Sequence, residues 1–286
     1  MNSKLKNLLE LNISIVLIST AAVLVRYIDL DPTIISFWRG LLGFSLLGIF
    51  MTFKKTSFKI SDIKAQKRLL FSSFLFGAHW LTYFYALQTA GIALGMLSLF
   101  TFPVITALLE PIYFKTKLNK RHLILALTVL IGLYIMLPEL NLSNDTTKGL
   151  ISGIISALFY AMRNLTMKSN SKKYSSTVLM FYQFLFITVV FTPFLFYKDT
   201  EKTLDFLPYL IGLGVVTTAI GHTLFIQSLK NFSVSTASLI ASSQPVFGIL
   251  MGIIFLNEIP NLVTIIGGTI ILSTVIIESL STKNNK

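Results

Sequence analysis

The sequence predicts an all-α polytopic membrane protein with ten transmembrane helices, arranged as two inverted five-helix repeats (5+5). Three observations predict this fold class: an apolar composition, apolar runs that are long enough to cross a bilayer, and a pattern that recurs along the chain. Of the 286 residues, 53% are hydrophobic and only 13% are charged. Such a chain has too few polar side chains to cover a globule in water, so most of its surface is expected to face lipid.

Ten runs are long enough to cross about 30 Å of hydrocarbon as helices. They are continuously apolar, whereas a membrane β-strand alternates its two faces over about 10 residues. The stretches between them are too short to form a second core, so one membrane domain is predicted over 1–286, with repeat one at 1–140 and repeat two at 141–286. The predicted spans are 8 to 28, 32 to 53, 69 to 88, 92 to 114, 121 to 138, 149 to 168, 177 to 197, 208 to 229, 234 to 257 and 261 to 280.

Lysine and arginine are distributed unequally between the loops on the two sides of the predicted spans. If the N-terminus is cytoplasmic, most of the 24 basic residues lie on the cytoplasmic side, and the outer loops hold only Lys148, Lys198 and Lys202. Cytoplasmic loops of membrane proteins are enriched in basic residues. A multi-pass protein of a bacterial inner (plasma) membrane with both termini in the cytoplasm is therefore expected. The net charge of +12 then reflects topology, and no nucleic-acid partner is expected.

Shifting the sequence on itself aligns spans three and four with spans eight and nine. A shift of 142, the separation of Pro103 and Pro245, also places Phe102 on Gln244, and a nearly equal shift places Arg39 on Gln183. Because five is an odd number of helices, the second copy would cross the membrane in the opposite sense. Two such halves favour two conformations of similar energy, each open to one side, with a site near the midplane.

The residues also resemble the EamA-type, ten-helix branch of the drug/metabolite transporter (DMT) superfamily over nearly the whole chain. This resemblance implies the 5+5 inverted repeat and the export or exchange of amino acids, related metabolites or drugs, without identifying a substrate. Two positions depart from the family pattern: Thr116 stands where a Glu is frequent, and Gln183 occupies the place that matches Arg39. The matching elements are Pro32, Arg39, Tyr85-Ala86-Leu87, Pro103, Leu109-Glu110-Pro111, Pro245, Glu258 and Gly267.

Arg39 is the strongest candidate for a functional charge within the membrane. It lies seven residues inside Pro32, about 10 Å along a helix, which is too deep for easy snorkelling to the interface. Intramembrane charges are costly and commonly functional, although an arginine that binds helix-end carbonyls is an equally good interpretation. For Arg26 and Arg163, which lie nearer the predicted span ends, snorkelling is the preferred interpretation.

Polar aromatic residues from two matched spans are expected near the same depth. His79, Trp80 and Tyr83 lie in span three, and His222 lies in span eight. A histidine there can hydrogen-bond a substrate carboxylate or carry a coupling proton, and the alternative is a structural histidine bonded to a neighbouring helix. The predicted substrate-binding set is Arg39, His79, Trp80, Tyr83, Gln183, His222, Ser242 and Gln244.

Three further residues have candidate roles in coupling and motion. Glu110 is a candidate proton carrier together with His79 and His222, and the competing interpretation is an interfacial Glu paired with Lys115. Pro103 and Pro245 each remove a helix hydrogen bond at matched depth, so they are candidate hinges, with a static kink as the alternative.

The function predicted from these features is secondary transport of a small metabolite by alternating access. An amino-acid-like substrate and export are favoured, and a passive channel or lipid scramblase is the alternative. An intramembrane enzyme is less favoured, since the chain has no cysteine and no zinc-protease, nucleophile-elbow or phosphate-loop motif. No metal or cofactor is expected. The expected partners are a small-molecule substrate, the bilayer, and a second copy of the chain packed through small-residue faces at Gly91-x-x-x-Gly95 or Gly248-x-x-x-Gly252.

Overall fold

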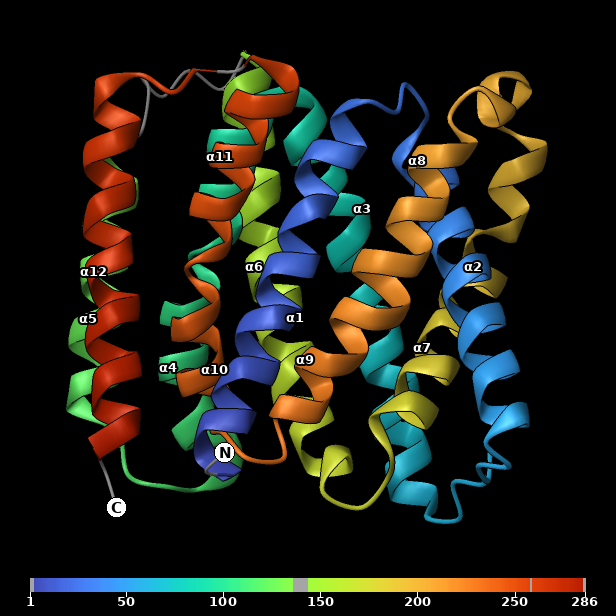
Figure 1. The fold of residues 1–286 in the computed structure, drawn as a ribbon, viewed down its shortest axis with the longest axis horizontal. Coiled ribbons are helices and arrows are strands. Elements are labelled where there is room, and N and C mark those ends of the chain that lie inside the picture. The colour runs from blue at the N-terminus through green and yellow to red at the C-terminus, as the bar shows by residue number, and fades with distance from the viewer. Residues whose placement is uncertain (1–2, 136–143, 258, 285–286) are drawn as a thin grey trace.

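The computed structural model describes residues 3–135, 144–257 and 259–284, and helices make up its framework (Figure 1). No strand occurs in those ranges, which confirms the all-helical prediction. The elements are α1 Ser3–Arg26, α2 Pro32–Phe53, α3 Ile63–Leu99, α4 Phe102–Phe114, α5 Lys120–Ile135, α6 Asp145–Ser171, α7 Ser176–Phe191, η1 Thr192–Phe196, η2 Glu201–Leu204, α8 Leu207–Gly212, η3 Leu213–His222, α9 Thr223–Ser228, α10 Val234–Ala241, α11 Gln244–Leu256 and α12 Leu262–Asn284.

Seven helical stretches within the described ranges are long and apolar enough to cross a membrane. The protein is therefore a multi-pass membrane protein. Of the other predicted spans, 69 to 88 lies within α3, and 261 to 280 begins one residue before α12. The span 121 to 138 coincides with α5 as far as Ile135, and its last three residues lie outside the described residues. The seven stretches are Leu5–Arg26, Pro32–Phe53, Leu94–Phe114, Asp145–Ser171, Ser176–Phe196, Leu207–Ser228 and Val234–Leu256.

Four of the helices, α2, α3, α6 and α10, begin after a residue whose side chain caps them. At α2, the Asp31 carboxylate accepts a hydrogen bond of 2.9 Å from the Thr33 amide, and Pro32 occupies the first helical position. An acceptor at the cap satisfies an amide that has no partner within the helix, and proline has no amide to satisfy. Asp62 caps α3 and Asn144 caps α6 in the same way.

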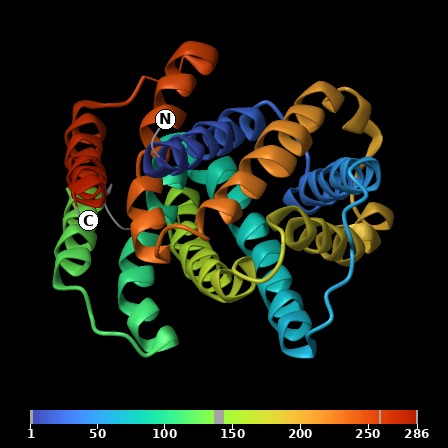
Figure 2. The ribbon, with the colours of Figure 1, turned by 60° about the horizontal axis from the view of Figure 1, so that its bottom comes forward.

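Helices that are far apart in the sequence pack against one another. α2 packs on α7, α3 on α6, α5 on α12, and α1 on η3 and α11. Figure 2 shows α5 and α12 as a pair at one edge and α2 beside α7 at the other. The first and last helices begin and end at the same end of the bundle, where the basic loop between α2 and α3 also lies (Figure 1). Thus helices before residue 140 pack mainly on helices after it.

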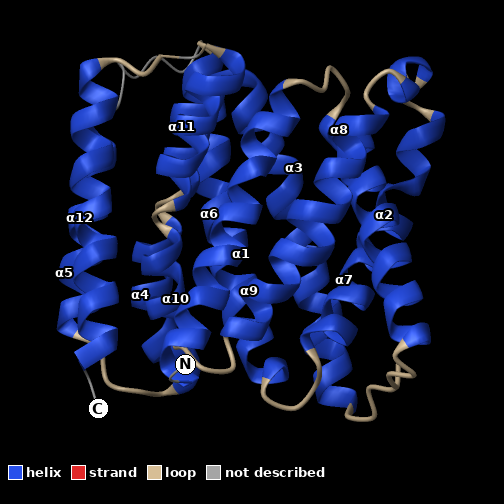
Figure 3. Cartoon of the chain, viewed as in Figure 1, coloured by secondary structure: helices blue, strands red, loops and turns tan. Residues whose placement is uncertain are grey.

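Both predicted hinge prolines lie at interruptions rather than at kinks within continuous helices. α3 ends at Leu99 and α4 begins at Phe102, while α10 ends at Ala241 and α11 begins at Gln244. Figure 3 shows the second interruption as a loop segment between α10 and α11. Pro103 and Pro245 each stand in the first turn of the following helix, where a missing amide costs no hydrogen bond. Each of spans four and nine therefore consists of two helical segments that meet at this point, where the sequence predicted a kink.

The two glycine pairs have different structural roles. A Cβ atom at Gly248 would lie 2.2 Å from the Met96 sulfur, so this face of α11 is closed by α3 within the chain. Gly91 has φ +77° and no neighbour within 4 Å of an added Cβ atom. It marks a bend in α3, because this backbone conformation disfavours any residue with a Cβ. Gly91 therefore serves the path of the backbone within the chain, and the homodimer stays a prediction.

Candidate functional site

The Arg39 guanidinium is buried in the middle of the bundle, with a 1% exposed side chain. Its Nε and Nη2 atoms donate hydrogen bonds of 2.9 Å to the hydroxyls of Thr218 and Thr217. Its Cζ atom lies 4.2 Å from the centroid of the Trp80 ring and 5.0 Å from that of Phe84. Arg39 belongs to α2, and its guanidinium is held by hydroxyls of η3 and aromatic rings of α3. Neither kind of contact neutralises its charge.

The two threonines are held in place by the wide π-helical segment η3. The Thr217 hydroxyl donates to the Leu213 carbonyl at 2.7 Å, which leaves its lone pairs directed at the arginine. Adjacent Thr217 and Thr218 reach the same guanidinium. π-helical turns are rare and occur frequently at functional sites. This pair was not among the predicted site residues, because its only signal in the sequence is two consecutive hydroxyl residues in an apolar span.

Arg163 is a second buried guanidinium, and its predicted snorkelling to the interface was wrong. Its side chain is 0% exposed, because α6 continues to Ser171 and places Arg163 well inside the helix. Its Nη2 donates to the Gln183 side-chain oxygen at 2.6 Å, and its Nη1 donates to Asn164 at 2.9 Å. Its Cζ atom lies 4.0 Å from the centroid of the Phe76 ring. Arg26, by contrast, is exposed at the end of α1, as snorkelling requires.

Gln183 connects this second arginine to the first half of the chain. Its Nε2 donates to the Ser72 hydroxyl on α3 at 2.8 Å, while its Oε1 accepts from Arg163. When the sequence is shifted on itself, Gln183 falls on Arg39, so the second repeat has a neutral side chain at this position. The structure supplies a guanidinium at that position from the neighbouring helix α6.

Neighbouring aromatic side chains contact the two arginines. The Phe76 and Trp80 ring centroids are 4.7 Å apart, and the Arg163 guanidinium lies over Phe76 while that of Arg39 lies over Trp80. His222 meets the Phe76 ring edge-on at 4.9 Å. We call the group formed by Arg39, Phe76, Trp80, Arg163, Gln183 and His222 the arginine cluster.

His79 lies on the α6 side of this cluster in a stack of rings. Its centroid is 4.5 Å from that of Tyr160 and 5.8 Å from that of Tyr83. Its Nδ1 is 2.7 Å from the Ser156 hydroxyl, which itself donates to the His79 carbonyl at 2.9 Å. Because the hydroxyl has one hydrogen, His79 Nδ1 is the donor in this pair. In this conformation His79 is thus hydrogen-bonded to a neighbouring helix, as in the alternative interpretation of a structural histidine.

Ser242 and Gln244 are buried at the interruption between α10 and α11. Within the described ranges, no hydrogen bond or ring contact joins either residue to the arginine cluster. Ser242 instead donates to the Ser238 carbonyl at 3.3 Å. Six of the eight predicted site residues thus lie in or beside the cluster, and these two lie apart from it in this conformation.

Several buried polar atoms of the arginine cluster have no hydrogen-bond partner. They are Trp80 Nε1, Arg163 Nε and His222 Nδ1. The first two are donors only. Among the residues that the structure describes, ion pairs join Lys148 to Asp145, Lys173 to Asp62 and Lys198 to Asp31, so neither buried arginine takes part in one. The centre of the bundle is therefore rich in donors and positive charge and lacks an acidic partner.

Glu110 lies away from this centre and caps another helix. Its carboxylate accepts hydrogen bonds from the amides of Val234 at 2.8 Å and Ser235 at 2.9 Å, and a short one from the Ser235 hydroxyl. These amides belong to the first turn of α10, where a carboxylate is favoured by unpaired donors and by the helix dipole. The predicted pairing with Lys115 is not among its contacts, and its role as a proton carrier stays a prediction.

Lys168 binds the other side of the same turn. Its ammonium donates to the Phe232 carbonyl at 2.6 Å and, by a short hydrogen bond, to that of Leu229. Glu110 and Lys168 together hold the α9–α10 turn from both ends, and we call this arrangement the turn clamp. In the sequence, only its place at a span end distinguished Lys168.

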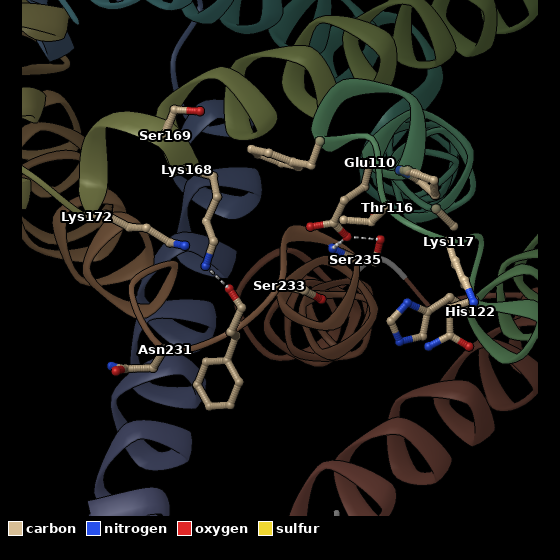
Figure 4. A pocket seen from close by; sticks show the side chains of 15 residues that line it. Glu110, Thr116, Lys117, His122, Lys168, Ser169, Lys172, Asn231, Ser233 and Ser235 are labelled. Carbon is tan, nitrogen blue, oxygen red and sulfur yellow. Dashed lines mark hydrogen bonds between the residues drawn. The ribbon is translucent and has the colours of Figure 1, made fainter.

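A pocket of about 650 Å³ opens beside the turn clamp. Figure 4 shows Lys168 and Lys172 on one side of it, Glu110 and Ser235 opposite them, and Lys117 with His122 farther along. Three of these side chains are ammonium groups, so the pocket attracts anions. It lies at the end of the bundle where α1 begins and α12 ends.

Comparison with known proteins assigns the chain to a family. The EamA-like transporter family matches residues 8–137 and again residues 147–280. The chain belongs to the EamA-like transporter family. It is a transporter and not an enzyme, as predicted. Glu258, one of the residues on which the resemblance was noted, lies outside the described residues.

Relatives in this family carry different names. An uncharacterized transporter of Archaeoglobus fulgidus is 31% identical over 93% of both chains. A pseudopaline exporter of Pseudomonas aeruginosa is 22% identical over 83% of this chain and 82% of its own. An S-adenosylmethionine uptake transporter of Rickettsia felis is 29% identical over 40% of each chain. A crystal structure that is 15% identical superposes with a TM-score of 0.78 over 98% of both chains and shares the fold.

Proposed function

We propose that the protein is a secondary transporter that moves a small carboxylate-bearing metabolite by alternating access, in the direction of export. The observation that carries this proposal is Arg39, a buried guanidinium with hydroxyl and aromatic neighbours and no acidic partner. A buried charge is costly unless it is paired. A carboxylate substrate would pair with it through two parallel hydrogen bonds, which is the geometry that guanidinium groups favour.

The proposal includes ten spans in two inverted repeats, with repeat one at 1–140 and repeat two at 141–286. The family matches once in each of these stretches, and the interruptions before Pro103 and Pro245 recur at the same separation. Pairing of α2 with α7 and of α5 with α12 supports a two-fold relation between the halves. Such a relation provides two conformations that open to opposite sides around one site.

The proposed orientation places both termini in the cytoplasm of a bacterium, with the protein in the inner membrane. The basic end pocket would then face the cytoplasm, and its ammonium groups would raise the local concentration of an anionic metabolite before release outside. This argument supports export over uptake. Proton coupling through His79 or His222 stays a prediction from the sequence.

Counterflow in proteoliposomes tests the carrier mechanism. Vesicles that contain the protein and an unlabelled carboxylate should transiently accumulate the labelled compound, because a carrier exchanges substrate across the membrane. A channel or a scramblase would give equilibration without such an overshoot. Arg39→Gln should abolish the overshoot, and Arg39→Lys should weaken it because the planar fork is lost. Overshoot at the wild-type level in Arg39→Gln would make this arginine structural.

A further inference from the structure

The arginine cluster contains more positive charge than one carboxylate requires. Arg39 lies over the Trp80 ring and Arg163 over the neighbouring Phe76 ring. Two like charges in a low-dielectric interior repel each other, and each also loses its hydration. Both arginines are bound only by neutral groups, namely hydroxyls, amide oxygens, a thioether and aromatic faces.

We propose, resting on the function proposed above, that Arg163 is a second substrate-binding guanidinium and that the substrate carries two anionic groups, as a dicarboxylate does. One carboxylate would pair with Arg39 and the other with Arg163. This assigns a role to a residue whose side chain is as deeply buried as that of Arg39.

Distances within the cluster limit how far apart the two guanidinium groups lie. Cζ of Arg39, the Trp80 centroid, the Phe76 centroid and Cζ of Arg163 are joined by steps of 4.2, 4.7 and 4.0 Å, and the two guanidinium carbons are no farther apart than the total of these steps. A short carbon chain with a carboxylate at each end would reach both groups, and its apolar part would contact the aromatic rings beside them.

The unpartnered atoms lie where such a ligand needs donors. Arg163 Nε and Trp80 Nε1 are buried donors without acceptors, and each would donate to a carboxylate oxygen. A substrate ammonium group would meet no carboxylate here, because neither arginine has an acidic neighbour in the described chain. Two positive charges nearby would repel it. The cluster therefore favours a dicarboxylate over the amino-acid-like zwitterion expected from the sequence.

Gln183→Glu is the sharpest test, because the Gln183 Oε1 is already 2.6 Å from Arg163 Nη2. A carboxylate at this position would form an internal ion pair with Arg163 and occupy the proposed second anion site. The Ser72 hydroxyl, which now accepts from Gln183, can turn to donate to the new carboxylate, so the variant is expected to fold. Gln227→Glu is a matched control, since Gln227 Oε1 accepts from the Ser176 hydroxyl and contacts no guanidinium.

The experiment measures binding to the purified full chain in detergent, with dicarboxylates from malonate to adipate, butyrate and alanine as probes. At least one dicarboxylate should bind the wild type with a Kd about ten-fold lower than butyrate or alanine, as a second charge-assisted pair predicts. Gln183→Glu should lose this preference while its melting temperature stays at or above that of the wild type, and Gln227→Glu should keep it.

Retention of the dicarboxylate preference in Gln183→Glu would overturn the proposal and make Arg163 structural. Equal or tighter binding of alanine or butyrate to the wild type, or no dicarboxylate binding at all, would overturn it too. Transport is judged separately by counterflow. Dicarboxylate binding without counterflow would refute the carrier function and leave the dicarboxylate site standing. Counterflow of alanine, with none of any dicarboxylate, would support the carrier function and refute the dicarboxylate site.

Discussion

At the scale of single residues, the hydroxyls of Thr217 and Thr218 determine where the Arg39 guanidinium lies. A leucine or valine at either position would leave guanidinium hydrogens unpaired in an apolar interior, where no water replaces the lost acceptor. The aromatic faces of Trp80 and Phe84 contribute attraction but do not accept hydrogen bonds along the N–H directions that the threonines occupy. The two hydroxyls therefore orient the charge as well as stabilise it.

Replacement of both hydroxyls should destabilise the fold. Thr217→Val together with Thr218→Val removes two hydrogen bonds to a buried charge, each worth roughly 1.5–3 kcal/mol. The melting temperature in detergent should fall by several degrees, measured by a fluorescence-based unfolding assay. Thr269→Val removes an exposed hydroxyl that bonds its own helix and serves as the control. Equal melting temperatures for the double variant and the control would show that the threonines do not hold Arg39.

At the scale of elements, the turn clamp joins α4 and α6 to the turn between α9 and α10. Glu110 satisfies amides at the start of α10, and Lys168 satisfies carbonyls of the turn that follows α9. This arrangement replaces contacts that water would make in an open turn, so it holds the α9–α10 turn against α4 and α6 in the present conformation. Movement of α10 away from α4 requires these hydrogen bonds to break.

Loss of the Glu110 cap should open the α9–α10 turn. The chain has no cysteine, so Ser233→Cys gives a single reporter beside the clamp. Glu110→Ala should raise its reaction rate with a thiol reagent roughly five-fold or more, as the loss of about 1–2 kcal/mol predicts. Glu110→Gln keeps one acceptor oxygen and should have a smaller effect. Identical rates in all three proteins would contradict the cap, whereas loss of proton-driven transport in Glu110→Gln alone would support the proton carrier.

The two helix interruptions provide a second prediction at this scale. Pro103→Ala and Pro245→Ala restore an amide to the first turns of α4 and α11, which allows the helices to extend back through the interruptions. If the interruptions are hinges, turnover should fall several-fold while substrate affinity stays close to that of the wild type. Initial rates and binding constants measured on the same preparations separate these two effects. Unchanged turnover in both variants would make the interruptions static.

At the scale of the whole molecule, helices of one predicted half pack on helices of the other. α2 and α7 form one edge, α5 and α12 form the opposite edge, and α3 with α6 crosses the centre (Figure 2). Relative movement of the two halves would therefore change most helix contacts at once. Discrete alternative packings are favoured over continuous deformation in such an arrangement.

Topology is testable with single cysteines at opposite ends of the bundle. Cysteine in place of the exposed Asp199 should react with an impermeant thiol reagent applied to spheroplasts, and cysteine in place of the exposed Lys59 should react only after the membrane is opened. Reaction at the Lys59 position in intact spheroplasts would reverse the proposed orientation. The same variants must retain counterflow, which shows that the cysteine did not alter insertion.

Apolar run length and proline spacing were enough to predict the helical fold and the matched interruptions. Depth along a single span also predicted the burial of Arg39 and His79. For Arg163, depth along the predicted span gave the wrong result. The helix α6 continues beyond the predicted span and packs on α3 and α9, and a hydropathy window does not take such contacts into account. The roles of Lys168 and Glu110 escaped prediction for a related reason: their partners are backbone groups of another helix, and backbone groups leave no residue signature.

The cap that Glu110 provides has a consequence for how the protein is made. Glu110 is synthesised more than a hundred residues before Val234 and Ser235, which supply the amides that it caps. In the nascent chain this carboxylate therefore first lacks its final partners, and until α10 has been synthesised α4 also lacks its contacts with that helix. A chain that stops before α10 would therefore display an unmatched acidic group and uncovered apolar helix faces, which are features that quality-control proteases recognise in unfinished membrane proteins.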